Sequence, residues 1–314
     1  MLQQFDERNR ELIVNVNGRL LPRNQAGVSP FDSSVQGGDA VWEGLRLYDG
    51  RIFRLTEHLD RLRRSAKALA FAEIPTNDEI IHQIKRTLAA NNMRNEVHIR
   101  LTLSRGEKFT SGMDPRLNQS GPTLIILAEY KKPVYDKSGL RLVTSTYRRP
   151  GPDVLDPKIH HNNLLNSILA KIEANAAGAD DALMLDARGF VAETNATHVF
   201  GVTGGAVSTP RTVACPEGIT RAVVLELCRD REIPCRERDI SLAELYACDE
   251  MFSSGTMGEL APIIALDGRT IANGRPGRIY QRLAAAFHDL TETEGMVVVD
   301  EAQASTGVAG GNTP

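Results

Sequence analysis

The sequence predicts a two-domain α+β protein. Its 314 residues are more than one hydrophobic core of ordinary size needs. Helix-like and strand-like segments occur on both sides of a polar stretch, residues 129–139, that contains Lys131-Lys132-Pro133. We expect a smaller N-terminal domain over residues 1–130, a linker over 131–139 and a larger C-terminal domain over 140–300. Residues 301–314 are small and polar, and we expect them to form a flexible tail.

Hydrophobic periodicity and turn residues define the elements of the first domain. Strand patterns meet at Asn17-Gly18 and at Asp49-Gly50, residue pairs that favour tight hairpin turns. A helix is expected from about Thr56, and a second helix begins with a capping box, Thr76 followed by Glu79. Residues 97–103 alternate as a strand does, and residues 122–128 form an apolar run typical of a buried strand.

The second domain repeats this mixture of strands and helices. A strand is expected over residues 140–145, followed by a long helix over 164–177 that ends at Gly178, a residue type common after helix C-termini. Residues 182–185 and 190–191 form a predicted hairpin. One helix should begin near Thr220, and the last helix should span residues 279–290.

Composition excludes several classes of protein. With 37 basic and 40 acidic residues, the net charge of −3 gives no electrostatic reason to expect nucleic acid or an anionic membrane as a partner. No apolar run approaches the roughly 20 residues that span a bilayer. Residues 1–10 are polar and do not resemble a secretory signal. The four cysteines form no Cys-x-x-Cys pair, so we expect reduced thiols, no metal site and a cytoplasmic protein.

Two short stretches of the second domain hold the residue types that indicate a binding site. Glu193 ends a predicted strand as a carboxylate among apolar neighbours. Gly218-Ile219-Thr220 begins a predicted helix, where unpaired backbone N–H groups and the helix dipole favour an anion. A carboxylate keeps a protonated pyridine nitrogen charged, and a helix N-terminus holds a phosphate. The two stretches together indicate a site for pyridoxal phosphate, whose protonated ring withdraws electrons from a substrate carbanion.

Each of these residues also has an interpretation without chemistry. Glu193 alone is typical of a surface strand end, and Thr220 alone is typical of the N-cap of an ordinary helix. Arg61 is a candidate phosphate ligand because guanidinium binds phosphate bidentately, although a lone helix arginine is commonly solvated. Residues 253–258 offer hydroxyl groups and glycines for phosphate or carboxylate contacts, or form an ordinary loop.

The order and spacing of several motifs make the chain similar to one family. It resembles the class IV, fold type IV aminotransferases, which include branched-chain and D-amino-acid aminotransferases and aminodeoxychorismate lyase. The resemblance extends from about Leu12 to Leu290. Its specific motifs are residues 38–46 (GDAVWEGLR), 57–62 (EHLDRL), 186–200 (DARGFVAETNATHVF), 209–210 (TP), 218–221 (GITR) and 249–256 (DEMFSSGT).

The resemblance implies a homodimeric enzyme with pyridoxal 5'-phosphate in the cleft between its two domains. Four residues would hold the cofactor phosphate: Arg61, Ile219, Thr220 and Thr256. Glu193 would meet the pyridinium nitrogen. The substrate pocket would be lined by Trp42, Arg100 and the backbone of Thr256-Met257.

The residue of this chain that corresponds to the family's covalent lysine stays open. Family members carry it before the long helix, as Lys-x-x-Asn or Lys-x-x-x-Asn. Counted back from Asn163, these spacings fall on His160 and Ile159, whereas Lys158 fits the longer spacing only when counted from Asn162. Three interpretations stay open. Lys158 holds the cofactor, or His160 replaces the lysine and transamination is lost or very slow, or Lys171 inside the helix serves as a poor third candidate. His160 and His161 are also compatible with polar residues near the site that have no chemical role.

Other departures from the family concern the substrate. Two tyrosines of many branched-chain enzymes are replaced by Gly37 and His98, and His198 stands where members usually carry asparagine. Arg116 resembles a loop arginine that binds carboxylate in D-amino-acid aminotransferases. We expect transamination of branched-chain L-amino acids with 2-oxoglutarate. The alternatives are a D-amino-acid or (R)-amine transaminase, an aminodeoxychorismate-type lyase, and a cofactor-binding protein without transaminase activity that has His160 at the lysine position.

Overall fold

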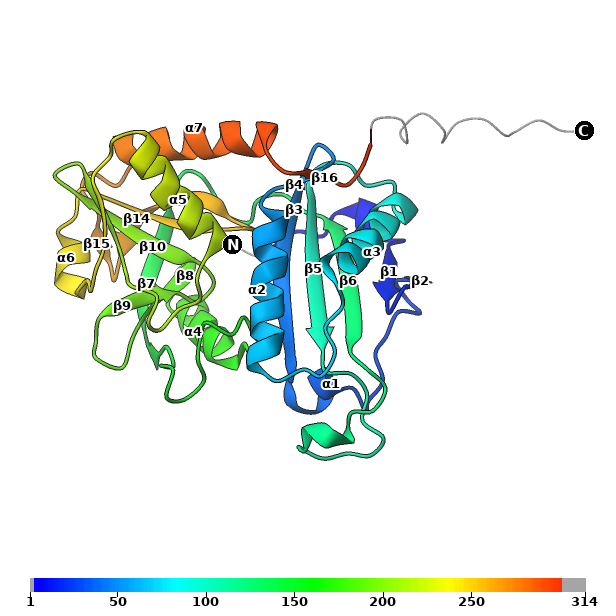
Figure 1. Cartoon of the computed structure of the whole chain (residues 1–314). Coiled ribbons are helices and arrows are strands. Elements are labelled where there is room, and N and C mark those ends of the chain that lie inside the picture. Colours follow the sequence, from blue (N-terminus) through cyan, green and yellow to red (C-terminus); the bar gives the residue numbers. More distant parts are fainter. Residues whose placement is uncertain (1–2, 301–314) are drawn as a thin grey trace, which may run out of the picture. The chain divides into compact units, whose positions relative to one another are not determined.

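The computed structural model describes residues 3–300 and divides into two compact units (Figure 1). Unit 1 comprises mainly Pro133–Leu290, together with Arg64–Leu69. Among the described residues, unit 2 comprises Gln4–Arg63, Ala70–Lys132 and 291–300. The larger domain was expected to extend over residues 140–300. Residues 291–300 cluster with unit 2 because strand β16 (Met296–Val297) pairs with β4 (Arg51–Ile52). The predicted tail, 301–314, lies outside the described residues.

A seven-stranded sheet in the order β16-β4-β3-β5-β6-β1-β2 forms the centre of unit 2. The bounds of its other strands are β1 Ile13–Val16, β2 Arg19–Pro22, β3 Ala40–Tyr48, β5 Val97–Ser104 and β6 Thr123–Tyr130. Its helices are α1 Ser33–Gly37, α2 Leu55–Ala68, whose last residues belong to unit 1, and α3 Asn77–Ala90. Helix α3 packs on β1 and β6. The apolar stripes of α2 and α3 are buried, as Leu59, Leu62, Ile80, Ile84 and Leu88 show.

The turn and cap predictions for this unit are confirmed. Asn17 and Gly18 have φ values of 50° and 77°, and Asp49 and Gly50 have φ values of 40° and 79°, as tight hairpins require. Thr76 and Glu79 form the expected capping box at the start of α3.

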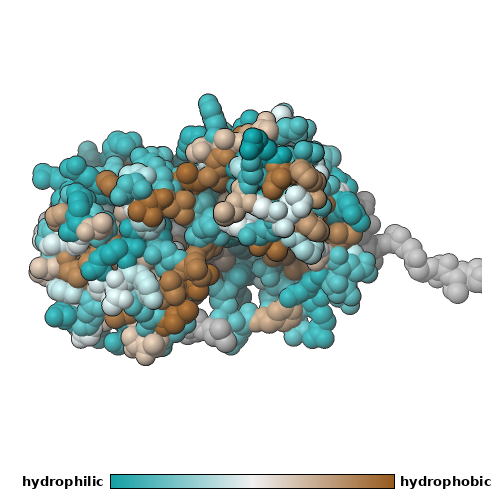
Figure 2. Space-filling view, turned by 90° about the horizontal axis from the view of Figure 1, so that it is seen from below, coloured by the Kyte–Doolittle hydropathy of each residue, from teal (hydrophilic) through white to brown (hydrophobic). Residues whose placement is uncertain are grey.

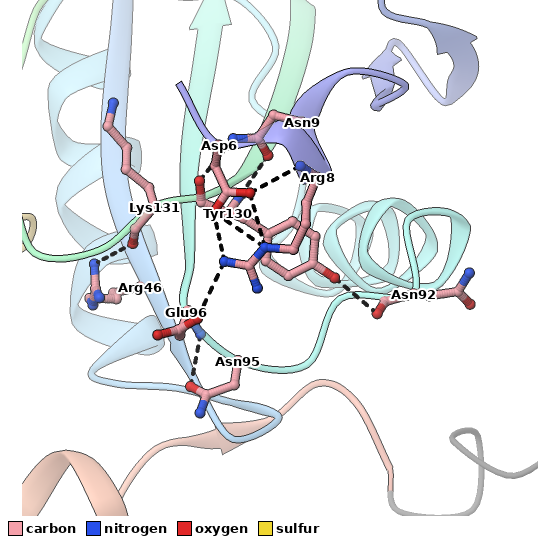
Figure 3. A network of polar contacts seen from close by, with 9 residues as sticks. All are labelled: Asp6, Arg8, Asn9, Arg46, Asn92, Asn95, Glu96, Tyr130 and Lys131. Carbon is pink, nitrogen blue, oxygen red and sulfur yellow. Dashed lines mark hydrogen bonds and ion pairs between the residues drawn. The ribbon is translucent and has the colours of Figure 1, made fainter. Parts of the chain in front are cut away.

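The N-terminal segment is fixed to the end of β6 by a polar network (Figure 3). The side chain of Asn9 donates to the carbonyl of Tyr130 and accepts from its N–H, both at 2.8 Å. The guanidinium of Arg8 stacks on the Tyr130 ring and pairs with Asp6 and Glu96. These contacts satisfy backbone groups where the sheet ends.

A nine-stranded sheet forms the centre of unit 1, in the order β12-β11-β10-β13-β14-β7-β8-β9 with β15 paired to β14. The strands are β7 Leu140–Arg148, β8 Asp181–Leu185, β9 Val191–Thr194, β10 His198–Thr203, β11 Ala206–Thr209, β12 Cys235–Glu237, β13 Glu250–Gly255, β14 Glu259–Leu266 and β15 Arg269–Thr270. The helices are α4 Leu165–Ala176, α5 Ile219–Asp230, α6 Leu242–Tyr246 and α7 Arg278–Thr293.

The core of unit 1 explains how its functional segments are positioned. Helix α4 packs through Ala170 and Ala174 against Ala182 and Met184 of β8. Phe200 of β10 and Phe252 of β13 stack with ring centroids 4.8 Å apart. The first contact fixes β8, which pairs with the strand β9 that carries Glu193, and the second fixes β10, which begins at His198. Within the described residues, no helix is both long and apolar enough to cross a membrane.

Candidate active site

Glu193 lies in β9 as a buried carboxylate with a cation beside it. Its Oε1 is 2.6 Å from Nη2 of Arg149, and both side chains are largely inaccessible. Arg149 follows β7, and its guanidinium also donates to Ser167 Oγ at 3.1 Å, in the first turn of α4. An adjacent guanidinium stabilises an ionised carboxylate. The arrangement therefore offers a charged acceptor that a protonated ring nitrogen can meet.

Helix α5 begins without a side-chain cap. Gly218 is its N-cap residue, with φ −70° and ψ 128°, and Thr220 is the second residue inside the helix. The interpretation of Thr220 as an ordinary N-cap is therefore wrong, since the extended cap conformation belongs to Gly218. A Cβ at Gly218 would lie 2.2 Å from Nε2 of His198, so glycine is required by the imidazole beside it. The first N–H groups of α5 point out of the helix, as in anion sites.

The carboxylate and the helix start lie close together. Arg149 Nε donates to the carbonyl of Ala214 at 3.4 Å, in the segment that leads into α5. Burial raises the pKa of the next residue, Cys215, and the charge of Glu193 raises it further. Glu193, Arg149 and residues 214–218 therefore form one polar centre in unit 1.

The end of β13 reaches the same part of unit 1. His198 pairs with Ser254 across the β10–β13 ladder, two residues before Thr256. A Cβ at Gly255 would lie 2.9 Å from Thr197 Cγ2, which shows how closely this turn approaches the start of β10. His198 therefore lies close both to the end of β13 and to Gly218 at the start of α5. Met257 accepts a hydrogen bond from Val134 N at 3.2 Å through its carbonyl.

The candidate covalent residues lie on the loop before α4. Lys158 is half-exposed, and its Nζ lies 3.5 Å from Oε1 of Glu217, the residue before Gly218. The backbone N–H of His160 donates to Ser65 Oγ at 3.0 Å. Burial, and then the charges of Arg149 and His160, lower the pKa of His161. Lys158 therefore approaches the start of α5, and His161 lies near enough to Arg149 to feel its charge.

Lys171 lies elsewhere. Its ammonium pairs with Asp181 at 3.0 Å and donates to the carbonyl of Asp180. These contacts join α4 to the start of β8 and leave Lys171 in a structural role.

Unit 2 carries the remaining predicted residues on β3, β5, α2 and the loop between β5 and β6. The Arg100 guanidinium stacks 3.4 Å from the centre of the Trp42 ring, and burial lowers the pKa of Arg100 to about 10. His98 is buried, and its Nε2 has no hydrogen-bond partner among the described residues. Burial, and then the charges of Lys131, Arg46 and Arg100, lower the pKa of His98 to about 3. A neutral imidazole therefore lies near a stacked arginine.

Arg61 and Arg116 have contrasting surroundings. Arg61 is buried and held bidentately by Glu43. Arg116 is 90% exposed and pairs with Asp114 of its own turn. That contact is typical of a solvated surface arginine.

Sequence reasoning did not identify Arg149 or Glu43. Arg149 follows the expected 140–145 strand, which extends to Arg148, and a charged residue at a strand end is a weak signal. Glu43 had a clearer signal, because it is a carboxylate between Val41 and Leu45 in a strand that is otherwise buried.

Comparison with known proteins identifies the class. Residues 40–266 match the family model described as amino-transferase class IV. The chain belongs to the class IV aminotransferase family. It is 40% identical over 290 residues to a putative branched-chain-amino-acid aminotransferase of Methanocaldococcus jannaschii, covering 92% of this chain and 99% of the relative.

Two curated plant relatives are longer than this chain. It is 54% identical over 291 residues to branched-chain-amino-acid aminotransferase-like protein 2 of Arabidopsis thaliana, covering 92% of this chain but 52% of that protein. The chain thus spans about half the length of the first curated relatives it matches.

Solved structures agree with the family assignment. The branched-chain amino acid aminotransferase of Thermobaculum terrenum in its PLP-bound holo form has a TM-score of 0.81 and 29% identity, covering 90% of this chain and 95% of that one. The branched-chain aminotransferase of Thermoproteus uzoniensis with norvaline has a TM-score of 0.83 and 31% identity, covering 90% and 96%. The predicted α+β, fold type IV class is confirmed.

Proposed function

We propose that this chain binds pyridoxal 5'-phosphate in unit 1 and transaminates branched-chain amino acids with a 2-oxo acid such as 2-oxoglutarate. The observation that carries the proposal is the buried Glu193–Arg149 pair beside the uncapped start of α5. One feature suits a protonated pyridine nitrogen and the other suits a phosphate. The names of the relatives, several of them branched-chain aminotransferases, support the choice of substrate.

The residues present fit this cofactor at both ends. Gly218 has no side chain to fill the space at the start of α5, and a Cβ there would collide with His198. Ile219 and Thr220 would donate backbone N–H groups to the phosphate, and Thr256 would be a further contact. Arg61 stays a candidate phosphate ligand on the family resemblance. When bound, the cofactor supplies an electron sink for the negative charge that develops at the substrate Cα.

The other residues would bind the substrate and move its proton. Lys158 would hold the cofactor through its side-chain nitrogen until the substrate amine displaces it. The freed amine of Lys158 would then take the Cα proton and deliver it to the cofactor carbon that had held the lysine. Arg100, oriented by Trp42, would bind a substrate carboxylate. The Met257 backbone would be a separate substrate contact. Arg116 remains a candidate for a second carboxylate contact.

A second candidate function is favoured by the surroundings of Lys158. This lysine is half-exposed and pairs with Glu217, whereas His161 lies near the Arg149 that holds Glu193. If His160 occupies the lysine position, the chain binds the cofactor without a covalent bond, because imidazole forms no imine. Transamination would then be absent or very slow.

Borohydride reduction distinguishes the two candidates. The purified chain is loaded with cofactor, reduced and digested, and its peptides are examined by mass spectrometry. A cofactor adduct on Lys158, lost together with activity in Lys158→Ala, supports the enzyme. Lys85→Ala, an exposed lysine of α3, is the matched control. If bound cofactor is recovered without any adduct and Lys158→Ala behaves like the wild type, the binding protein is correct.

The substrate is tested with a panel of amino donors. Branched-chain L-amino acids, D-amino acids, (R)-amines and an aminodeoxychorismate-type substrate are compared, each donor with 2-oxoglutarate and with pyruvate. Preference for L-leucine, L-isoleucine or L-valine with 2-oxoglutarate supports the proposal. If activity is confined to another class of donor, the branched-chain proposal is wrong and the alternative for that class takes its place.

A cytoplasmic homodimer is the proposed physiological form. Leu165, Ile168 and Ile172 recur on one face of α4 and are at least half exposed, a stripe suited to a second copy. Hydrophobic patches also interrupt the otherwise hydrophilic surface drawn in Figure 2. Sedimentation of the wild type and of Ile168→Glu tests this. A monomeric wild type would contradict it.

A further inference from the structure

Two free cysteines lie on neighbouring elements of unit 1. Cys228 is in the last turn of α5, and Cys235 is the first residue of β12. The turn between them is closed by Ile233, whose N–H donates to the carbonyl of Cys228 at 2.8 Å. Cys228 is fully buried, whereas Cys235 is partly exposed. The two thiols are therefore close along the chain but differ in their access to solvent.

An ion pair fixes how α5 lies against β12. Nη2 of Arg221 donates to Oε2 of Glu237 at 2.6 Å. Cys235 is two residues before Glu237 in the strand, so the two side chains share one face of β12. Cys228 is seven residues after Arg221, nearly two helical turns, so these two share one stripe of α5. Because the chain runs along α5 and returns along β12, the contact nested inside the ion pair joins Cys228 to Cys235.

The two thiols interact directly. A side-chain hydrogen bond joins them, and it raises the pKa of Cys228 and lowers the pKa of Cys235. Burial raises the pKa of Cys228 further. The charge of Arg221 and the backbone N–H of Arg236 also lower the pKa of Cys235, against the effect of its partial burial. Cys228 is therefore the donor, and Cys235 is the thiol that loses its proton first.

We propose that Cys228 and Cys235 form a dithiol that a peroxide oxidises reversibly to a disulfide. The thiolate is the form of cysteine that attacks a peroxide, and Cys235 combines thiolate character with access to solvent. Its sulfur takes one oxygen of hydrogen peroxide, the O–O bond breaks, and the other oxygen leaves as hydroxide. Cys235 is then a sulfenic acid.

Cys228 resolves the sulfenic acid. Its sulfur attacks the sulfur of Cys235, the S–O bond breaks, and the leaving hydroxide takes the proton of the Cys228 thiol to form water. A disulfide needs the sulfurs about 2.05 Å apart, and thiols that share a hydrogen bond are already neighbours. The product ties the last turn of α5 to β12. A dithiol reductant opens it again by thiol–disulfide exchange.

Tryptic digestion tests the proposal directly, because arginines separate the two cysteines. Trypsin places Cys228 in peptide 222–229 and Cys235 in peptide 232–236. The full chain is treated with one equivalent of hydrogen peroxide, its remaining thiols are blocked with N-ethylmaleimide in urea, and it is digested without reductant. We expect the two peptides to be joined, with a mass about 2 Da below the sum of the free peptides, and to separate in dithiothreitol.

Serine variants assign the two roles. In Cys228→Ser the sulfenic acid has no resolving thiol, so dimedone should trap it on Cys235. In Cys235→Ser the thiol of Cys228 should react with peroxide at least about tenfold more slowly than Cys235 does in the wild type. Cys248→Ser is the matched control, since it removes another buried thiol, which donates to the carbonyl of Leu245 at 3.0 Å. It should keep the linked peptides.

Several outcomes would overturn the proposal. It is wrong if the wild type gives no linked peptides, or gives them only when peroxide is added in urea. It is also wrong if Cys215 or Cys248 is linked to the same extent, because thiols would then pair without regard to the register of α5 on β12. Fast oxidation of Cys228 in Cys235→Ser would contradict the role of Cys235 as the attacking thiol.

Circular dichroism checks that the serine variants fold. If one of them does not, the alkylation rates of the two thiols in the folded wild type replace it, read from the same two peptides. Cys235 should be labelled at least about tenfold faster than Cys228, and equal rates would contradict the assigned roles.

Discussion

Replacing Gly218 by alanine would add a methyl group where the structure has no room. The new Cβ would lie 2.2 Å from Nε2 and 2.3 Å from Cδ2 of His198. The backbone at Gly218, φ −70° and ψ 128°, suits alanine as well as glycine. Backbone strain therefore contributes nothing, and the perturbation is a steric collision between two side chains.

The magnitude follows from the freedom of His198 to move. Its imidazole is 7% exposed and begins β10, where its backbone pairs with Ser254, so it cannot turn into solvent without repacking. Overpacking of this kind costs about 1–3 kcal/mol, and the lower entropy of the unfolded alanine chain offsets about 0.4–1 kcal/mol. We expect a net loss of about 1–2 kcal/mol, with a fall of about 2–4 °C in Tm for each kcal/mol.

The assay is a double-mutant cycle measured by urea unfolding. The free energies of unfolding are compared for the wild type, Gly218→Ala, His198→Ala and the double variant. In the His198→Ala background the alanine at position 218 has room, so it should cost nothing or stabilise slightly. If Gly218→Ala is as stable as the wild type, or if its cost persists without His198, the steric argument is wrong.

The other predictions concern charge and exposure. Arg149→Met removes the cation beside the buried Glu193 and should destabilise the chain by about 3–5 kcal/mol. The double variant Glu193→Gln with Arg149→Met should recover part of that loss. Urea unfolding measures both free energies. The depressed pKa of His98 means that the unfolded chain binds a proton more readily than the folded one below about pH 6.5. As the pH is lowered from about 6.5 to 3, the free energy of unfolding should therefore fall by up to about 1.4 kcal/mol per pH unit. His98→Phe should remove that slope. If the pH dependence of the free energy of unfolding is unchanged in His98→Phe, then His98 is solvated in the folded protein. Arg116→Gln, at an exposed local pair, should change stability by less than about 0.5 kcal/mol, which thermal unfolding can check.

Local features could be predicted from the sequence because their causes are local. The turns at Asn17-Gly18 and Asp49-Gly50 need residues that tolerate positive φ, and the capping box needs only two side chains three residues apart. The start of α5 at Gly218-Ile219 was placed within one residue for the same reason.

Contacts between distant segments could not be predicted in this way. Arg149 meets Glu193 only because β7 lies parallel to β8 and β8 antiparallel to β9, and no pattern within either segment specifies that order. The pairing of β16 with β4 is another contact of this kind. Met296–Val297 is too short to be recognised as a strand, and its partner β4 lies at the other end of the chain.

The stacked pair Trp42–Arg100 has a spectroscopic consequence. Trp42 is the only tryptophan of the chain, and it belongs to unit 2. Its fluorescence therefore monitors the melting of one unit, while far-ultraviolet circular dichroism records the melting of both. If the melting temperatures from fluorescence and from circular dichroism differ, the two units unfold independently. A single free energy of unfolding would then describe neither unit.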